Sequence, residues 1–272
     1  MNGLGAPFAG QEFAAALPWT IAAVVAALAI TFVVAVRVGR HAVIDVTWGL
    51  GFVAIAWTSF LLSGGEGDPL RRVALLVAVT AWGVRLAAHI ANRSRGHGED
   101  PRYEAIMRKA TGNPDLHMLR RVYLTQGAIM WFVSLPVQVA MFSAAETTWL
   151  FWVGLVVFVV GLFFETVGDY QLHRFRSDPD SAGKVLDTGL WRYTRHPNYF
   201  GDACAWWGIF LMAADGGIAW LTILSPVVMN LLLAKGTGKP LLEKDMAGRR
   251  PEYVAYVRRT SGFVPWFPKK DV

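Results

Sequence analysis

The sequence predicts an all-α protein that crosses a membrane several times. Hydrophobic residues make up 54% of the 272-residue chain, and charged residues make up only 17%. The apolar residues gather in stretches of about 20 residues, the length that an α-helix needs to cross the hydrocarbon core of a bilayer. The charged residues collect between these stretches. A soluble protein of this size mixes the two kinds of residue more evenly, so we predict one integral-membrane domain over residues 1–272.

Hydropathy predicts seven spans, at 18–36, 42–63, 73–92, 121–143, 148–172, 198–214 and 217–234. The first span is too long for the core of a secretory signal and lacks a basic N-terminal region, so we expect it to be retained. The single cysteine, Cys204, lies within the sixth predicted span. This excludes an internal disulfide and a cysteine metal cluster.

The basic residues predict which side of the membrane each loop faces. Arginine and lysine collect after the first, third and fifth spans and in the tail after the seventh. The opposite loops carry Glu146 and Asp215, and only residues 64–72 contain arginines there, Arg71 and Arg72. Because cytoplasmic loops carry an excess of Lys and Arg, we predict an N-terminus outside and a C-terminus in the cytoplasm. In a bacterium this would be the inner membrane.

Three predicted spans carry ionisable residues near their cytoplasmic ends, and such residues usually indicate function because they are costly inside a membrane. Asp45 of the second span could equally be a helix cap or the partner of an arginine. Residues four apart share a helix face, which groups Arg85, His89 and Asn92, one turn after Trp82, and groups Glu165, Asp169, His173 and Arg176. These residues are either solvated helix ends or the lining of a polar cavity in the cytoplasmic half of the helix bundle. In the second case, the apolar outer half of the bundle would admit an apolar substrate from the lipid.

A basic loop within residues 187–206 leads into the sixth span. Pro197 is favoured at the first turn of a helix, so a group of basic residues stands beside a helix N-terminus: Arg192, Arg195 and His196. The unpaired N–H groups and the dipole of a helix N-terminus suit a phosphate or another anion. Within the helix, Asn198, Asp202 and Trp206 recur every four residues and share one face.

The tail at residues 239–268 is amphipathic and basic. One interpretation is an interfacial helix anchored by Phe263, Trp266 and Phe267. The other is a cover that closes over a bound cofactor through Glu243, Tyr253 and Tyr256. Both interpretations can hold together.

A large anionic cofactor fits these residues best. Arginines hold phosphates, while carboxylates and asparagine accept hydrogen bonds from ribose hydroxyls and amides. No metal site is predicted, because the six histidines form no His-x-x-x-His pair and no carboxylates cluster as ligands. The sequence also contains no Gly-x-Gly-x-x-Gly, no Walker loop and no support for a Ser-His-Asp hydrolase.

Several motifs resemble those of the steroid 5α-reductase family. They are Arg-His-Pro-Asn-Tyr-Phe-Gly-Asp at 195–202 with the Trp-rich span after it, Pro-Leu-Leu-Glu-Lys at 240–244, Tyr-x-x-Tyr at 253–256 and Phe-Val-Pro at 263–265. The match is strongest over residues 150–268. Two earlier segments, at 45–52 and 93–103, look like a bacterial membrane branch of that family. The resemblance implies seven transmembrane helices, NADPH on the cytoplasmic side, and reduction of a carbon–carbon double bond conjugated to a carbonyl.

The resemblance also implies roles by position. Asp45 is nearest to the family's acidic residue that addresses the substrate carbonyl, and Trp82 falls where the family has a carbonyl-binding tyrosine. With the polar stripes and the motif, the candidate cofactor-binding residues are Arg85, Asn92, Arg93, Glu165, Asp169, His173, Arg176, Arg195, His196, Asn198, Tyr199, Asp202, Glu243 and Tyr253. Steroid enzymes of the family have a glutamate where this chain has Asp45, and Trp82 lacks the hydroxyl of the family's tyrosine. Both departures argue against a steroid substrate and make another lipidic enone or an unsaturated acyl chain as plausible.

The sequence thus predicts an NADPH-dependent membrane reductase of an apolar, lipid-like substrate. The Arg-His-Pro-x-Tyr-x-Gly signature is also similar to isoprenylcysteine carboxyl methyltransferases, so a membrane methyltransferase that uses S-adenosylmethionine is the alternative. The polar stripes of the second and third spans favour the reductase. A membrane scaffold or lipid-binding protein without activity is the third possibility. We expect membrane lipids and a small apolar substrate as partners, no nucleic acid, and a monomer.

Overall fold

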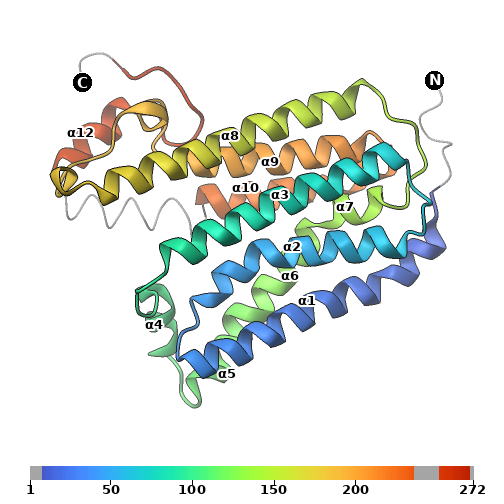
Figure 1. The fold of residues 1–272 in the computed structure, drawn as a ribbon, viewed down its shortest axis with the longest axis horizontal. Helices are drawn as coiled ribbons and strands as arrows, with labels where there is room; N and C mark the ends of the chain where they lie inside the picture. The colour runs from blue at the N-terminus through green and yellow to red at the C-terminus, as the bar shows by residue number, and fades with distance from the viewer. Residues whose placement is uncertain (1–7, 236–250, 270–272) are drawn as a thin grey trace. The chain divides into compact units, whose positions relative to one another are not determined.

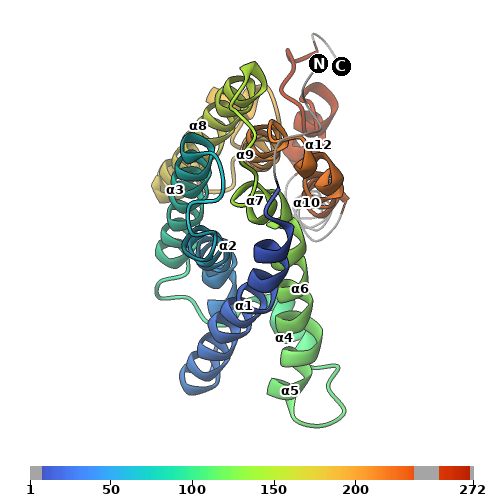
Figure 2. The ribbon, with the colours of Figure 1, turned by 90° about the vertical axis from the view of Figure 1, so that its right-hand side faces the viewer.

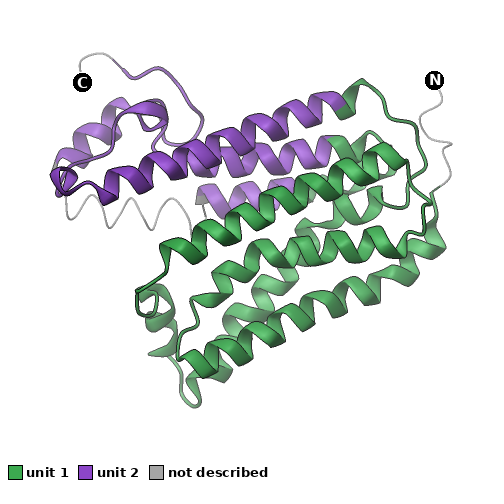
Figure 3. Cartoon of the chain, viewed as in Figure 1, with its two compact units in different colours: residues 1–151, 212–225 green, residues 152–211, 226–272 purple. Residues whose placement is uncertain are grey.

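The computed structural model describes residues 8–235 and 251–269, and its regular structure there is helical (Figure 1). This confirms the prediction of an all-α protein. The chain divides into two compact units, Met1–Phe151 with Met212–Ser225 (unit 1) and Trp152–Leu211 with Pro226–Val272 (unit 2), as Figure 3 shows.

Unit 1 begins with three long helices, α1 (Gly10–Val38), α2 (Val43–Leu62) and α3 (Pro69–Arg93). Shorter helical segments follow: α4 (Pro101–Met107), α5 (Pro114–Met118), a π-helical turn (Leu119–Tyr123), α6 (Leu124–Val133), α7 (Leu135–Ala140) and the 3₁₀ segment Ile218–Thr222. Helix α2 lies between α1 and α3 in both views (Figures 1 and 2). A Cβ atom on Gly83 would stand 2.5 Å from the carbonyl oxygen of Gly49, so the backbones of α2 and α3 touch at this glycine pair.

Unit 2 contains α8 (Trp149–Ser177) from Trp152 onward, the 3₁₀ turns Pro179–Ser181 and Gly189–Arg192, most of α9 (Pro197–Ala214), most of α10 (Leu224–Lys235) and α12 (Pro251–Arg259). Glycines let α8 and α9 pack backbone against backbone. A Cβ atom on Gly201 would stand 2.5 Å from the backbone nitrogen of Glu165, and one on Gly161 would collide with Ala205. The close packing brings the polar residues of the two helices onto facing turns.

Four helices, α1, α2, α3 and α8, are long and apolar enough to cross a membrane. They correspond to the first, second, third and fifth predicted spans. The predicted span 121–143 consists instead of the π-helical turn, α6 and α7, and the break falls where Pro136 cannot donate a helical hydrogen bond. The predicted spans 198–214 and 217–234 correspond to α9, and to the last 3₁₀ segment with α10. The count of seven spans stays a prediction.

Asx–Pro pairs begin three helices of unit 1. The side chain of Asp68 accepts a hydrogen bond from the nitrogen of Arg71 at 2.8 Å, ahead of α3. Asp100 and Asn113 cap α4 and α5 in the same way. An Asx cap followed by proline at the first helical position starts a helix efficiently. These pairs explain why α3 begins at Pro69 and why the stretch between the third and fourth predicted spans contains two short helices.

The two arginines of the 64–72 segment are buried within unit 1. The guanidinium of Arg71 is fully buried, lies 3.6 Å from the carboxylate of Asp215, and donates to the carbonyl oxygen of Glu146 at 3.1 Å. Arg72 donates to Ser63 Oγ at 2.7 Å and stacks over the ring of Phe60 at 4.7 Å. Arg71 is thus paired with a carboxylate and Arg72 is held by neutral partners, so both basic side chains of this otherwise acidic loop are buried inside the protein.

Candidate functional site

A cluster of buried polar residues lies where α8 meets α9 in unit 2. Glu165, Asp169 and Asp202 are 3%, 6% and 8% exposed. Asn198 donates through Nδ2 to Asp169 Oδ1 at 3.1 Å. Buried carboxylates are costly unless they have hydrogen-bond partners. Their collection between two apolar helices therefore indicates a candidate functional site. The structure thus brings together four of the candidate cofactor-binding residues.

The other candidates on α8 lie toward its C-terminal end. His173 and Arg176 are exposed and follow Asp169 along the same helix. Because α8 is continuous to Ser177, the predicted spacing of one helix face holds for the whole stripe. The stripe therefore runs from buried carboxylates to exposed basic side chains.

The Arg-His-Pro loop holds the C-terminal end of α12. Arg195 Nη1 donates to the carbonyl oxygens of Thr260 at 2.6 Å and Val257 at 3.1 Å, and its backbone nitrogen donates to Ser261 at 2.9 Å. Cationic side chains at the end of a helix satisfy its last carbonyl groups. Part of this guanidinium therefore fixes the tail, while its predicted contact with an anion stays a prediction.

The same loop joins α12 to α8 through Trp191. The hydroxyl of Tyr256 donates to the carbonyl oxygen of Trp191 at 2.5 Å, and Trp191 Nε1 donates to the carbonyl oxygen of Gly168 at 3.1 Å. Burial, and then the neighbouring Tyr253, raise the pKa of Tyr256, so its hydroxyl remains a donor at neutral pH. The loop is thereby held between two helices.

Two of the remaining candidates of the motif and the tail, His196 and Tyr253, are buried. His196 is 5% exposed and stacks flat on the ring of Tyr199, with ring centres 5.4 Å apart. Tyr253 is 5% exposed and packs beside Tyr256. Glu243 lies outside the described residues.

The proposed catalytic residue Asp45 lies in the first turn of α2 in unit 1, where two side chains contact it. Tyr103 donates its hydroxyl to Asp45 Oδ1, and Arg102 donates to Oδ2 at 2.9 Å. Gln126 Nε2 lies 3.5 Å from the hydroxyl of Tyr103. The sequence left open an arginine partner for Asp45, and the structure identifies this arginine as Arg102.

Arg102 itself is fixed by Asp100. Its Nε and Nη2 atoms donate to the two carboxylate oxygens of Asp100 at 2.9 and 2.8 Å. These bonds, opposed by burial, raise the pKa of Arg102. Burial works to raise the pKa of Asp100, but the hydrogen bonds from Arg102 outweigh it and lower that pKa. Burial and then the charge of Asp45 raise the pKa of Tyr103.

The third-span candidates separate into buried and exposed groups along α3. Trp82 is fully buried and meets the ring of Phe52 edge-on, with ring centres 5.4 Å apart. Arg85 is half-buried, while Asn92 and Arg93 are exposed in the last turn of α3. Trp82 thus belongs to the aromatic core between α2 and α3, and its proposed catalytic role stays a prediction.

A second polar group in unit 1 was missed by the sequence reasoning. His41 is 3% exposed, with Nδ1 3.1 Å from the hydroxyl of Tyr123 and Nε2 3.0 Å from Asp115 Oδ1. Tyr123 closes the π-helical turn, a form often found at functional sites. Glu99 accepts from the backbone nitrogens of His41 and Ala42 and so caps α2. In the sequence, only the Asx–Pro start at Asn113 and Pro114 could have hinted at this group, because its members are far apart along the chain.

A metal centre finds no support in the described part of the chain. Among residues 8–235 and 251–269, no group of three or more His, Cys, Asp or Glu side chains has an arrangement that could hold a metal ion.

Comparisons with known proteins find one family model and several curated relatives. A family model described as protein of unknown function (DUF1295) matches residues 31–260. The steroid 5-alpha-reductases DET2 of Gossypium hirsutum and Arabidopsis thaliana are 34% identical over 64 residues and 35% identical over 65 residues. Each alignment covers 24% of this chain, and 25% and 24% of the respective relative.

A third relative has a different activity in its name. The probable O-methyltransferase ustE of Ustilaginoidea virens is 36% identical over 67 residues, which is 25% of this chain and 23% of the relative. The chain thus spans about a quarter of the length of each of these curated relatives. No solved structure matches the chain significantly.

Proposed function

We propose, from the premise that this chain belongs to the DUF1295 family, that the protein is an integral-membrane reductase related to steroid 5α-reductases. It would use NADPH to reduce a carbon–carbon double bond conjugated to a carbonyl in an apolar, lipid-like substrate. We further propose the seven-span topology with a cytoplasmic C-terminus, the inner membrane as location if the source is bacterial, and a monomer.

The observation that carries the proposal is the buried group between α8 and α9. Asp169 and Asn198 are joined by a 3.1 Å hydrogen bond, and Glu165 and Asp202 lie buried on the same two helices. Buried carboxylate and amide groups suit ribose hydroxyls and a carboxamide, which is the chemistry that NADPH presents. The exposed basic residues His173 and Arg176, farther along α8, suit its phosphates.

The residues of this chain would bind the cofactor, orient the substrate and supply a proton to it. NADPH, when bound, supplies a hydride, and the protein supplies position and a dry environment. Reduction then also needs a proton at the substrate, and negative charge develops on the carbonyl oxygen. The proton held between Tyr103 Oη and Asp45 Oδ1 is suited to that oxygen, with Arg102 stabilising the remaining charge.

The half-exposed Asp115, the buried His41 and Tyr123 form a hydrogen-bonded path that could carry a proton from solvent as far as the hydroxyl of Tyr123. The Nε2 and Nδ1 atoms of His41 lie 3.0 and 3.1 Å from their partners. Asp115 is 40% exposed, which opens this path to water. Histidine is suited to such transfer because its two ring nitrogens can exchange donor and acceptor roles.

Ligand-induced stabilisation of the detergent-purified full chain tests the cofactor. A ligand that binds only the folded protein raises its Tm, by the equivalent of about 2.7 kcal/mol at 100 times Kd. We expect NADPH to raise the Tm of the wild type and of Arg174→Ala, but not of Arg176→Ala. Arg174 is the matched control because it is equally exposed on the same helix turn.

The methyltransferase remains the second candidate because of the similarity to ustE. A rise in Tm with S-adenosylmethionine and none with NADPH or NADH would replace the reductase by this alternative. No response to any of the three would favour a membrane scaffold or lipid-binding protein.

A further inference from the structure

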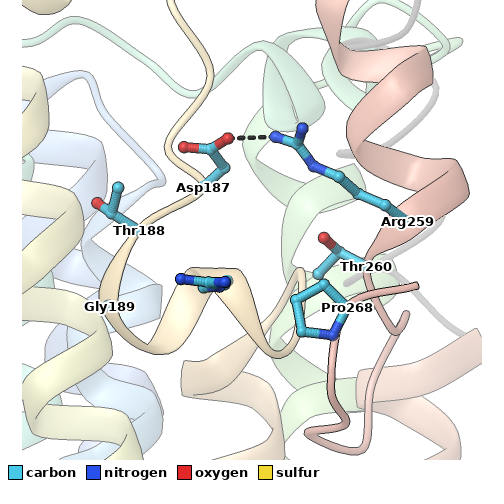
Figure 4. A pocket seen from close by; sticks show the side chains of 7 residues that line it. Asp187, Thr188, Gly189, Arg259, Thr260 and Pro268 are labelled. Carbon is cyan, nitrogen blue, oxygen red and sulfur yellow. Dashed lines mark hydrogen bonds and ion pairs between the residues drawn. The ribbon is translucent and has the colours of Figure 1, made fainter. Parts of the chain in front are cut away.

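Unit 2 contains a recess away from the buried carboxylates. Its volume is about 390 Å³, and it is lined by Asp187, Thr188, Gly189 and Arg192 together with Arg259, Thr260 and Pro268 (Figure 4). The first four residues belong to the turn before α9, and the last three belong to the end of α12 and the segment after it. Two arginines and two threonines thus line one small space.

The walls of this recess are held in place by hydrogen bonds. Gly189 has a φ of 59°, and a Cβ atom there would collide with Gln171, whose Oε1 accepts from the nitrogen of Leu190 at 3.0 Å. Arg195 fixes the carbonyl of Thr260 at 2.6 Å. The nitrogen of Lys269 donates to the carbonyl of Arg259 at 3.0 Å. The recess is therefore a built feature of the fold.

The two arginines of the recess are in different states. Arg259 forms an ion pair with Asp187, which Figure 4 shows as a dashed line. Arg192 is exposed and has no ion pair or hydrogen bond from its side chain within the described residues. Guanidinium groups match the geometry of phosphate oxygens and bind them through paired hydrogen bonds. One guanidinium is thus available at once, and the second becomes available when Asp187 releases it.

Exposed apolar side chains adjoin the recess. Trp266 and Phe267, next to Pro268, are 72% and 78% exposed, and Val264 is 58% exposed. The backbone of this segment is fixed, since the nitrogen of Trp266 donates to the carbonyl oxygen of Tyr193 at 2.9 Å. Exposed aromatic residues beside basic residues are typical of the region where a protein meets lipid headgroups.

We propose that this recess binds the phosphate group of an anionic membrane phospholipid. Arg192 is the first ligand, Trp266 and Phe267 enter the membrane interface beside it, and Arg259 turns to the phosphate as it leaves Asp187. Phosphate chemistry is shared with inorganic phosphate and with nucleotides, but the exposed aromatic residues favour the lipid. The site is independent of the proposed reductase activity.

Native mass spectrometry of the detergent-purified full chain tests the proposal. Dioctanoyl-phosphatidylglycerol is titrated against the wild type, Arg192→Gln, Arg192→Gln/Arg259→Gln and Asp187→Asn, with dioctanoyl-phosphatidylcholine as the zwitterionic comparison. We expect the double variant to bind phosphatidylglycerol about tenfold more weakly, because two charge-assisted contacts are lost. Asp187→Asn should bind it more tightly, because Arg259 is no longer neutralised. Arg192→Gln should lower affinity without lowering Tm, since this side chain holds no other residue in the described structure.

Arg108→Gln is the matched control, because Arg108 is 77% exposed and lies in unit 1. Equal losses in Arg108→Gln and the double variant would mean unspecific charge attraction and would overturn the proposal. Displacement of phosphatidylglycerol by inorganic phosphate, with no preference over phosphatidylcholine, would assign the recess to free phosphate and overturn the lipid. Loss of the NADPH response in the double variant, with lipid binding retained, would assign the recess to the cofactor and overturn it as well.

Discussion

Arginine serves opposite purposes in the two units. In unit 1, Arg71 is fully buried against Asp215 and two carbonyl groups, and Arg102 connects Asp45 to Asp100. In unit 2, Arg192 is exposed and lines a recess. The first kind holds the fold together, while the second kind is available to ligands. The comparison predicts that variants of the first kind lose stability and that variants of the second kind lose binding.

The largest loss of unfolding free energy should follow from Arg71→Met. Removing one partner of a buried ion pair leaves an uncompensated charge and costs about 3–5 kcal/mol. Asp215 would be left buried and would keep its hydrogen bonds from Thr148. Reversible unfolding in mixed detergent micelles measures the loss. The double variant Arg71→Met/Asp215→Asn should recover part of it. Arg192→Gln, at an exposed position of unit 2, should unfold within about 0.5 kcal/mol of wild type. A loss for Arg71→Met no larger than that of Arg192→Gln would contradict the comparison.

The next effect concerns the glycine contact between α8 and α9. Gly201→Ala places a methyl group against the backbone nitrogen of Glu165, so the two helices must separate at a cost of about 1–3 kcal/mol. The separation also disturbs the contact of Asp169 with Asn198, so the NADPH response should weaken along with stability. Gly112→Ala is the control, because nothing lies within 4 Å of a Cβ atom there. If the Gly201→Ala protein is as stable as wild type and keeps its full NADPH response, the proposed site does not depend on the close packing of α8 and α9.

The sequence could predict those features that depend on neighbouring residues along the chain. The helical class, the four long apolar helices and the stripe from Glu165 to Arg176 follow from hydropathy and from the spacing of one helix face. The start of α9 at Pro197 follows from proline chemistry. Such features need no knowledge of the tertiary structure.

Contacts between distant segments could not be predicted in this way. Asp45 meets Arg102 across 57 positions, His41 meets Asp115 across 74, and Arg195 meets Thr260 across 65. Each pairing depends on how the intervening chain turns. The role of Arg195 shows the consequence, because the sequence indicated an anion ligand while the structure also gives this side chain a fixed place at the end of α12. Local patterns identify polar residues, but only the fold decides which partner each one meets.

A smaller effect should appear at the contact of Tyr103 with Asp45. Tyr103→Phe removes one hydrogen bond to a charged group, which costs about 1.5–3 kcal/mol when the bond is fully formed and buried. Asp45 is 19% exposed, so we expect the lower end of this range or less. A double-mutant cycle of Tyr103→Phe with Asp45→Asn should give losses in unfolding free energy that are not additive, because the two side chains are in contact. Both single variants should keep the NADPH response and lose turnover, and full turnover in either would remove that residue from the proposed mechanism.

The smallest expected effect is the contribution of Asp100 to the loss of stability at acidic pH. Arg102 lowers the pKa of Asp100 in the folded protein below its ordinary value of 3.8. The folded state therefore binds fewer protons than the unfolded state in this range, and the contribution of Asp100 is fully present above the ordinary value. It is lost as the pH falls through the folded pKa. Because Asp100 and Arg102 are 28% and 39% exposed, solvent screening limits the contribution to about 0.5 kcal/mol or less. Unfolding curves between pH 6 and pH 3, at roughly constant ionic strength, should show a slightly shallower loss for Asp100→Asn than for wild type. A steeper loss in Asp100→Asn would mean that this carboxylate is destabilising, so that Arg102 serves Asp45 alone.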